Sequence, residues 1–174
     1  MITVEDLRQE LSAFDGKALT VLGEIEARHD TEPGYRNALT SLASAQEPAI
    51  ACGATWLIKH YLENDGLLTL YQIDQLLSAT PAMKDWKAQL HLCQSIRYLD
   101  LSDEETIILI PWLDLLMSHP RPFLRAWALD ALWRITRQHP VFAHIGIVAL
   151  EAAEADTAPS VQARLRTIRK GETL

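Results

Sequence analysis

The 174-residue sequence predicts an all-α protein built from helical hairpins. Leu and Ala are the most frequent residues, and the apolar positions recur at the spacing of an α-helix instead of alternating as they would in a strand. Turn and cap residues then divide the chain into helical segments joined by connections of about 2–5 residues, a length typical of antiparallel helix pairs.

Turn and cap residues set the bounds of each predicted helix. Ser102 and Glu105 have the spacing of a capping box. Pro48 and Pro120 stand where the first turn of a helix needs no amide donor, and Gly66 follows a helix end, where a left-handed residue is expected. The expected helices are 3–14, 17–29, 33–45, 48–64, 69–79, 82–99, 102–118, 120–138, 140–155 and 159–171.

Length and composition restrict the class of protein. A chain of 19.6 kDa suits one compact domain, which we expect to span residues 1–174. Its 48% hydrophobic and 22% charged residues favour a globular protein over a disordered one. Every apolar run is shorter than the ~20 residues of a membrane span, and the acidic N-terminal segment does not resemble a signal peptide. We therefore expect a cytoplasmic protein with no membrane partner.

Residues suited to catalysis or metal binding are sparse. Cys52 and Cys93 lack the spacing of a metal site or a disulfide framework and are expected to be buried thiols. No phosphate-binding glycine loop, HExxH helix or nucleophile elbow is present in the sequence. His119 and His139 each precede a proline at a helix junction, which favours a turn or cap role. We expect no cofactor, no metal ligand and no catalytic residue, while an enzymatic function stays open.

A repeat of 37–38 residues runs along the chain. Trp86, Leu124 and Val161 each open the apolar stripe of a basic helix, and the helix expected at 48–64 lies about one period earlier. Such a period is typical of stacked hairpins, because one hairpin buries its apolar face only against its neighbours. Residues 1–30 match no unit and are expected to form a capping hairpin. The register of the repeats in residues 31–100 stays open.

The segment Leu109–Leu132 resembles a HEAT repeat. The positions that carry the resemblance are Pro111, Leu113, Leu115, Leu116, Pro120, Leu124, Arg125, Ala128, Ala131 and Leu132. Asp156, Val161 and Leu165 carry a weaker match in the following unit. The resemblance implies a right-handed α-solenoid of about four to five HEAT-like hairpins, whose second helices line a concave surface. It also implies that a turn aspartate pairs with an arginine of the next unit. This ladder is interrupted in the third unit, where His119 occupies the aspartate position.

The net charge of −7 is divided unevenly along the chain. The second helices of the four units, 48–64, 82–99, 120–138 and 159–171, hold twelve Lys/Arg against three acids, and all other residues hold four against twenty. The resemblance therefore implies a basic concave face, which would attract an anionic partner even though the whole protein is acidic. In the alternative interpretation, these arginines pair with acids of neighbouring units and cover apolar surface with their stems.

The helix expected at 120–138 supplies most of the candidate binding residues. At 100° per residue its packed stripe contains Leu124, Ala128, Ala131, Leu132 and Ile135, whereas Ala126, Asp130, Trp133 and Arg137 face away. Trp133 is then either an exposed or groove-lining anchor or packs against the adjacent unit. The four other tryptophans, Trp56, Trp86, Trp112 and Trp127, are expected in the core. The candidate binding residues are Asp130, Trp133, Arg134, Arg137, Arg164 and Lys170.

Two classes of function remain open at this point. The leading hypothesis is a non-catalytic interaction or scaffold module whose basic concave face binds an acidic protein partner. The alternative is a nucleic-acid binder or a DNA glycosylase of the HEAT-like alkylpurine type, a similar family whose basic concave face uses Trp and Asp, as Trp133 and Asp130 suggest. The short chain and the acidic total disfavour the alternative. The sequence does not separate either one from a subunit of a permanent oligomer.

Overall fold

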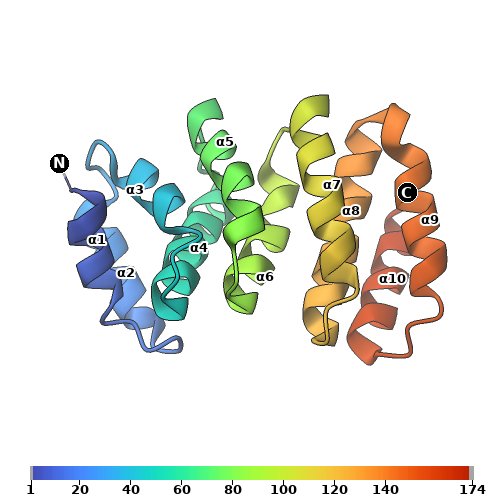
Figure 1. The fold of residues 1–174 in the computed structure, drawn as a ribbon, viewed down its shortest axis with the longest axis horizontal. Helices are drawn as coiled ribbons and strands as arrows, with labels where there is room; N and C mark the ends of the chain where they lie inside the picture. The colour runs from blue at the N-terminus through green and yellow to red at the C-terminus, as the bar shows by residue number, and fades with distance from the viewer. Residues whose placement is uncertain (1, 173–174) are drawn as a thin grey trace. The chain divides into compact units, whose positions relative to one another are not determined.

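The computed structural model describes residues 2–172 and contains ten α-helices and no strand in that range (Figure 1). Each helix lies within one of the ten segments expected from the spacing of apolar residues, apart from the last residue of the final helix. The helices are α1 (Val4–Leu11), α2 (Leu19–His29), α3 (Tyr35–Leu42), α4 (Pro48–Glu63), α5 (Leu70–Ala79), α6 (Trp86–Ser95), α7 (Asp103–Met117), α8 (Pro122–Gln138), α9 (Ala143–Ala153) and α10 (Pro159–Glu172). Short 3-10 turns at Ile96–Tyr98 and Pro140–Phe142 lie within the expected segments 82–99 and 140–155. A third, Thr80–Ala82, spans the junction between the expected segments 69–79 and 82–99.

The chain divides into two compact units, Met1–Tyr98 and Leu99–Leu174. In the first unit, α4 is the central helix and packs against α1, α2, α3 and α6. Its sequence is apolar on nearly all sides, as a helix surrounded by others requires. Thr55, the buried hydroxyl in the middle of α4, donates to the carbonyl of Ala51 at 2.8 Å.

In the second unit, α8 is central and packs against α7, α9 and α10. Its packed stripe is buried as predicted, including Leu124 and Ile135. The prediction that Ala126 and Asp130 face away from the core is wrong, because both are buried. A helical wheel assumes one covered face, whereas three neighbouring helices cover α8 on several sides.

Most of the expected helix starts are confirmed. Ser102 and Glu105 form a capping box on α7, and Pro48 is the first residue of α4. The start of α8 was misplaced: Pro122 opens the helix, and Pro120 lies before it. Both prolines are compatible with a helix N-terminus, so the local signal does not distinguish them.

The turn after α4 uses its glycine differently from the prediction. The left-handed residue is Asp65, with φ 62°, and not Gly66. A Cβ at Gly66 would lie 2.6 Å from carbon atoms of the Tyr61 ring. Gly66 is therefore required by the close approach of an aromatic ring, whereas Asp65 adopts the left-handed conformation that aspartate tolerates better than most residues.

The cysteines and tryptophans lie largely where the sequence predicts. Cys52 and Cys93 are buried free thiols, and burial raises the pKa of Cys52 to about 11. Trp112 is buried, while Trp56, Trp86 and Trp127 are half-buried. None of the helices described in residues 2–172 has both the length and the apolar character needed to cross a membrane.

Candidate binding face on α8 and α10

In the second unit, the basic residues lie on the second helix of each hairpin, α8 or α10, or on its N-cap, and not on the first helix, α7 or α9. All eight Lys/Arg residues of 99–174 lie on α8, on its N-cap or on α10: Arg121, Arg125, Arg134, Arg137, Arg164, Arg166, Arg169 and Lys170. α8 and α10 pack against each other. The first unit shows no such separation, because its Lys/Arg residues are divided equally between the second helices and the rest of that unit. The charge division inferred from the whole sequence is therefore strongest in the second unit.

A buried carboxylate links α8 to α10. The Asp130 side chain is only 2% exposed. Arg134 Nε, one turn further along α8, donates to Asp130 Oδ2 at 2.7 Å, and an Arg164 terminal nitrogen on α10 donates to Asp130 Oδ1 at 3.4 Å. Three predicted site residues are thus brought together, with Asp130 positioning two arginines and not lining the surface itself.

Trp127, which was expected in the core, completes this cluster. The guanidinium of Arg164 lies 3.8 Å from the centroid of the Trp127 ring, close enough for a cation–π interaction. Trp127 and Arg164 are 37 residues apart, like Leu124 and Val161, so they occupy equivalent positions in two consecutive second helices. Comparing equivalent positions of adjacent units is the sequence signal that could have revealed this contact.

Trp133 combines features of the two expected alternatives, an exposed anchor and a side chain packed against the adjacent unit. It is half-buried, and the guanidinium of the exposed Arg137 lies 5.4 Å from its ring centroid. On the α9 side, a Cβ at Gly146 would lie 3.1 Å from the Trp133 ring, so α9 approaches this tryptophan closely. Trp133 therefore packs beneath α9 and also supports an exposed arginine.

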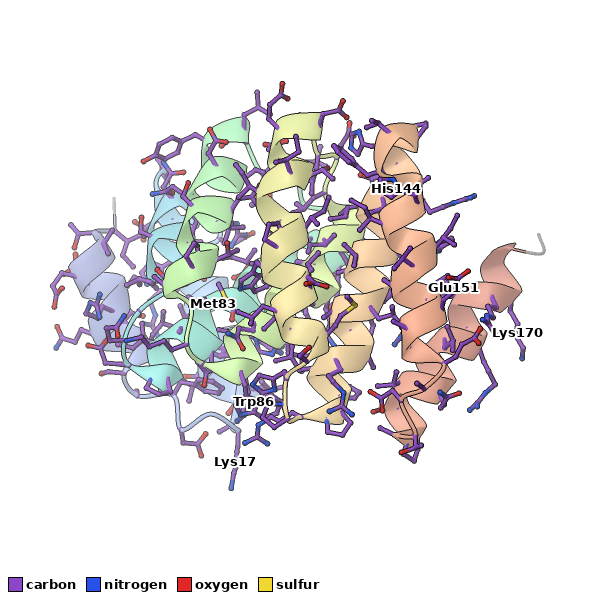
Figure 2. All side chains as sticks on the ribbon, turned by 45° about the vertical axis from the view of Figure 1, so that its right-hand side comes forward. Lys17, Met83, Trp86, His144, Glu151 and Lys170 are labelled. Atoms are coloured by element: carbon purple, nitrogen blue, oxygen red, sulfur yellow. The ribbon has the colours of Figure 1, made fainter. Side chains whose placement is uncertain are left out.

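Lys170 lies apart from the Asp130 cluster. It is exposed near the end of α10, where Figure 2 labels it. Six residues separate it from Arg164, which is about 9 Å along a helix axis. Nearby, Arg166 is also exposed, and Arg169 pairs with Glu154.

Arg125 pairs with the turn aspartate of the following hairpin, Asp156, whereas the resemblance implies an arginine in the unit after the aspartate. Its Nε and a terminal nitrogen donate to the two carboxylate oxygens of Asp156, at 2.7 and 3.1 Å, and it also donates to the His119 carbonyl at 2.9 Å. The hydrogen bond from Arg125 lowers the pKa of Asp156. His119 Nδ1 accepts from the Arg121 backbone at 3.1 Å, which confirms the expected turn role.

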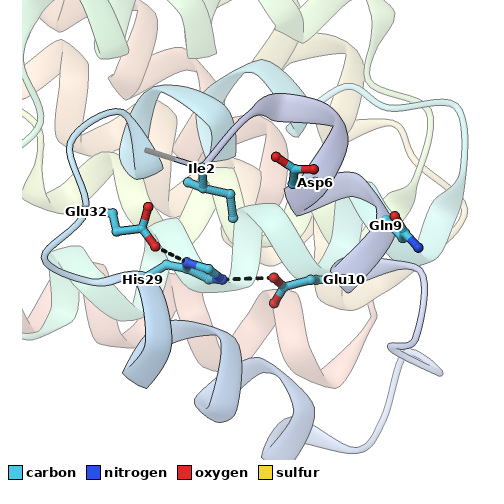
Figure 3. A pocket seen from close by; sticks show the side chains of 6 residues that line it. All are labelled: Ile2, Asp6, Gln9, Glu10, His29 and Glu32. Carbon is cyan, nitrogen blue, oxygen red and sulfur yellow. Dashed lines mark hydrogen bonds and ion pairs between the residues drawn. The ribbon is translucent and has the colours of Figure 1, made fainter.

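Two clefts provide concave surfaces in separate units. The first, of about 580 Å³, is lined by Asp6, Glu10, His29 and Glu32 together with Ile2 and Gln9 (Figure 3). Its acidic groups are engaged with neighbours: Asp6 with Thr3, and Glu10 and Glu32 with His29. The second, of about 210 Å³, lies in the second unit among α7, α8, α9 and the start of α10.

These observations define the class: an all-helical protein whose second unit concentrates its guanidinium groups on two packed helices. No group of three or more His, Cys, Asp or Glu side chains within residues 2–172 is arranged to hold a metal ion. Comparison with protein-family models, with curated proteins and with solved structures found no match for the chain.

Proposed function

We propose that the protein is a non-catalytic interaction module that binds an acidic segment of a partner protein on the α8–α10 face. One observation carries the proposal: every Lys/Arg of the second unit lies on these two packed helices or on the N-cap of α8. A surface of one sign raises the local concentration of oppositely charged segments, and the effect is local, so the net charge of −7 does not prevent it.

Several arginines of this face are held in place by other side chains. Arg134 is 42% exposed while its Nε is fixed on Asp130, and Arg137 lies over the Trp133 ring. A guanidinium presents five donors in a planar fork that matches a carboxylate, so one edge can be held by the protein while another faces a ligand. Fixing the side chain in advance reduces the entropy lost on binding.

The proposal includes a right-handed solenoid of HEAT-like hairpins with this face on its concave side. Packing within each unit supports that arrangement, because a second helix contacts the next second helix in both: α4 with α6, and α8 with α10. The Arg125–Asp156 pair supports it as well, since it joins two consecutive hairpins.

A catalytic role for Asp130 has no support in the geometry. A general base must reach its substrate, whereas this side chain is 2% exposed and both of its oxygens accept from arginines. Binding of duplex DNA without catalysis is a separate possibility, and the test below includes a measurement of it.

The test is a charge reversal at two exposed positions of the face. The Arg137→Glu/Lys170→Glu variant is compared with Lys17→Glu/Lys84→Glu, a matched control that reverses two exposed lysines of the first unit. The probe is a fluorescent glutamate-rich peptide titrated at several salt concentrations. We expect the face variant to bind about tenfold more weakly, equivalent to about 1.4 kcal/mol, and the control to stay within about twofold of the native protein.

Two results would overturn the proposal. One is an equal loss of affinity in the face variant and the control, because binding would then reflect total charge. The other is tight, salt-dependent binding of duplex DNA by the native protein with no binding of the acidic peptide, which would assign the face to nucleic acid.

A further inference from the structure

The first helices of the second unit expose apolar side chains at equivalent positions. Ile107 and Ile108 on α7 and Ile147 and Val148 on α9 form two doublets, each made of the fifth and sixth residues of its helix. With Leu115 on α7, these five side chains are each between 50% and 70% exposed. Isolated exposed apolar residues are ordinary, but repetition at the same place in two helices is not explained by packing of the unit itself.

The two helices that carry these side chains flank α8. Both pack against it, and both are drawn in front of it in Figures 1 and 2. The cleft of about 210 Å³ lies among these helices, with Asp114 and Met117 of α7 on one side and Ala149 and Ala152 of α9 on the other. Leu129 of α8 and Val161 of α10 contribute further apolar lining. Ser118 and the ion-paired Arg125 and Asp156 also line the cleft, so its wall is polar on one part and apolar on the rest.

The charge of this surface is opposite to that of the α8–α10 face. α7 and α9 contain five acidic residues, Asp103, Glu104, Glu105, Asp114 and Glu151, and no Lys or Arg. Glu104 lies four residues before Ile108, and Glu151 lies three residues after Val148, so carboxylates adjoin the apolar side chains along each helix. Asp114 is exposed at the cleft itself.

We propose that the α7–α9 surface, defined by Ile107, Ile108, Leu115, Ile147 and Val148 with its neighbouring cleft, docks a cationic amphipathic helix of a partner protein. Apolar side chains at i, i+3/i+4 and i+7 of that helix contact the two doublets and Leu115, and one of them enters the cleft. Lysines and arginines beside this apolar stripe face Glu104, Asp114 and Glu151. Recognition of an amphipathic helix by an apolar surface with complementary charge requires this combination.

Three synthetic peptides test the native protein directly. The first is an 18-residue leucine–lysine peptide with leucines at amphipathic helical spacing, the second has the same composition in scrambled order, and the third replaces lysine by glutamate. We expect the first to bind at least tenfold more tightly than either of the others. Equal binding of the scrambled peptide would overturn the proposal, because attraction would then depend on charge alone.

A double variant locates the binding surface. Leu115→Lys/Val148→Lys places positive charge at Leu115 and within the Ile147–Val148 doublet. Leu67→Lys/Leu70→Lys is the matched control at exposed apolar positions of the first unit. We expect the first variant to bind the leucine–lysine peptide at least tenfold more weakly and the control to remain within about twofold. Unchanged binding by Leu115→Lys/Val148→Lys would overturn the proposal.

Sedimentation of the free protein distinguishes a second copy from a helix of another protein. The proposal expects the native protein to keep the same sedimentation coefficient across the concentrations used for peptide binding. Concentration-dependent dimers that disappear in Leu115→Lys/Val148→Lys and persist in the control would overturn it, because the surface would then serve self-association.

Discussion

The two units each bury an ionisable group between two partners of opposite charge, and they do so with opposite chemistry. In the first unit, His29 is 7% exposed and lies between Glu32 at 2.7 Å and Glu10 at 2.9 Å. In the second unit, Asp130 lies between Arg134 and Arg164. Each cluster joins two helices of its unit, α1 with α2 or α8 with α10, so each one stabilises the packing between those helices.

The difference between the clusters lies in which member titrates near neutral pH. A neutral imidazole has one N–H donor, so His29 donates to both carboxylates only when it is protonated. Burial opposes that protonation, but the hydrogen bonds to Glu32 and Glu10 outweigh it and raise the pKa of His29. Arginine keeps its proton throughout this range. The first unit is therefore expected to be the more pH-sensitive of the two.

The largest expected effect is the loss of Asp130. Asp130→Ala leaves two guanidinium groups without their shared carboxylate inside the unit, and breaking a buried pair in this way costs about 3 kcal/mol. Urea denaturation, followed by tryptophan fluorescence, should show this decrease in the free energy of unfolding. Tryptophan fluorescence reports on this unit, because three of the five tryptophans, Trp112, Trp127 and Trp133, belong to it.

Asp114→Ala is the matched control for Asp130→Ala. It removes a carboxylate of the same unit from an exposed position, where substitutions change stability by about 0.5 kcal/mol or less. If the two variants unfolded at the same urea concentration, the Asp130 cluster would have no structural role and the comparison between the units would fail.

A second prediction concerns His91, whose Nδ1 lies 3.1 Å from the Thr55 hydroxyl. Burial, followed by the positive charge of Lys59, lowers its pKa to about 4. The unfolded chain then binds a proton more readily than the folded one as the pH falls below about 6.5. The first unit should lose about 2 kcal/mol of stability between pH 7 and pH 5 through this group.

His91→Gln tests this prediction, because glutamine retains polar atoms near Thr55 and does not titrate. The decrease in stability between pH 7 and pH 5, measured by urea denaturation, should be smaller in the variant than in the native protein by about 2 kcal/mol. An identical decrease in both proteins would assign the acid sensitivity to other groups.

The sequence predicts the helices of this protein far better than its ionic clusters. Helix bounds depend on residues close together in the chain, as in the Ser102–Glu105 capping box, so local spacing is sufficient. The burial of Asp130 depends on α10, whose Arg164 lies 34 residues away, and on the number of helices around α8. A helical wheel of α8 alone contains neither the position of Arg164 nor the number of neighbouring helices. His29 was missed for the same reason, because Glu10 belongs to another helix and nothing in the local sequence marks the pair.

The smallest expected effect tests the pH dependence of the His29 cluster itself. His29 has a raised pKa in the folded state, so its stabilising contribution is complete below the pKa of the unfolded chain and is lost as the pH rises through the folded value. At pH 6, His29→Gln should lower the free energy of unfolding by about 1–2 kcal/mol, because charged hydrogen bonds to two carboxylates are lost. The difference between the two proteins should shrink as the pH is raised towards 9, because the native protein loses the charge on His29 as the pH rises through the folded-state pKa. A difference of the same size at both pH values would show that His29 acts through packing, for instance against the Tyr35 ring 5.8 Å away, and not through its charge.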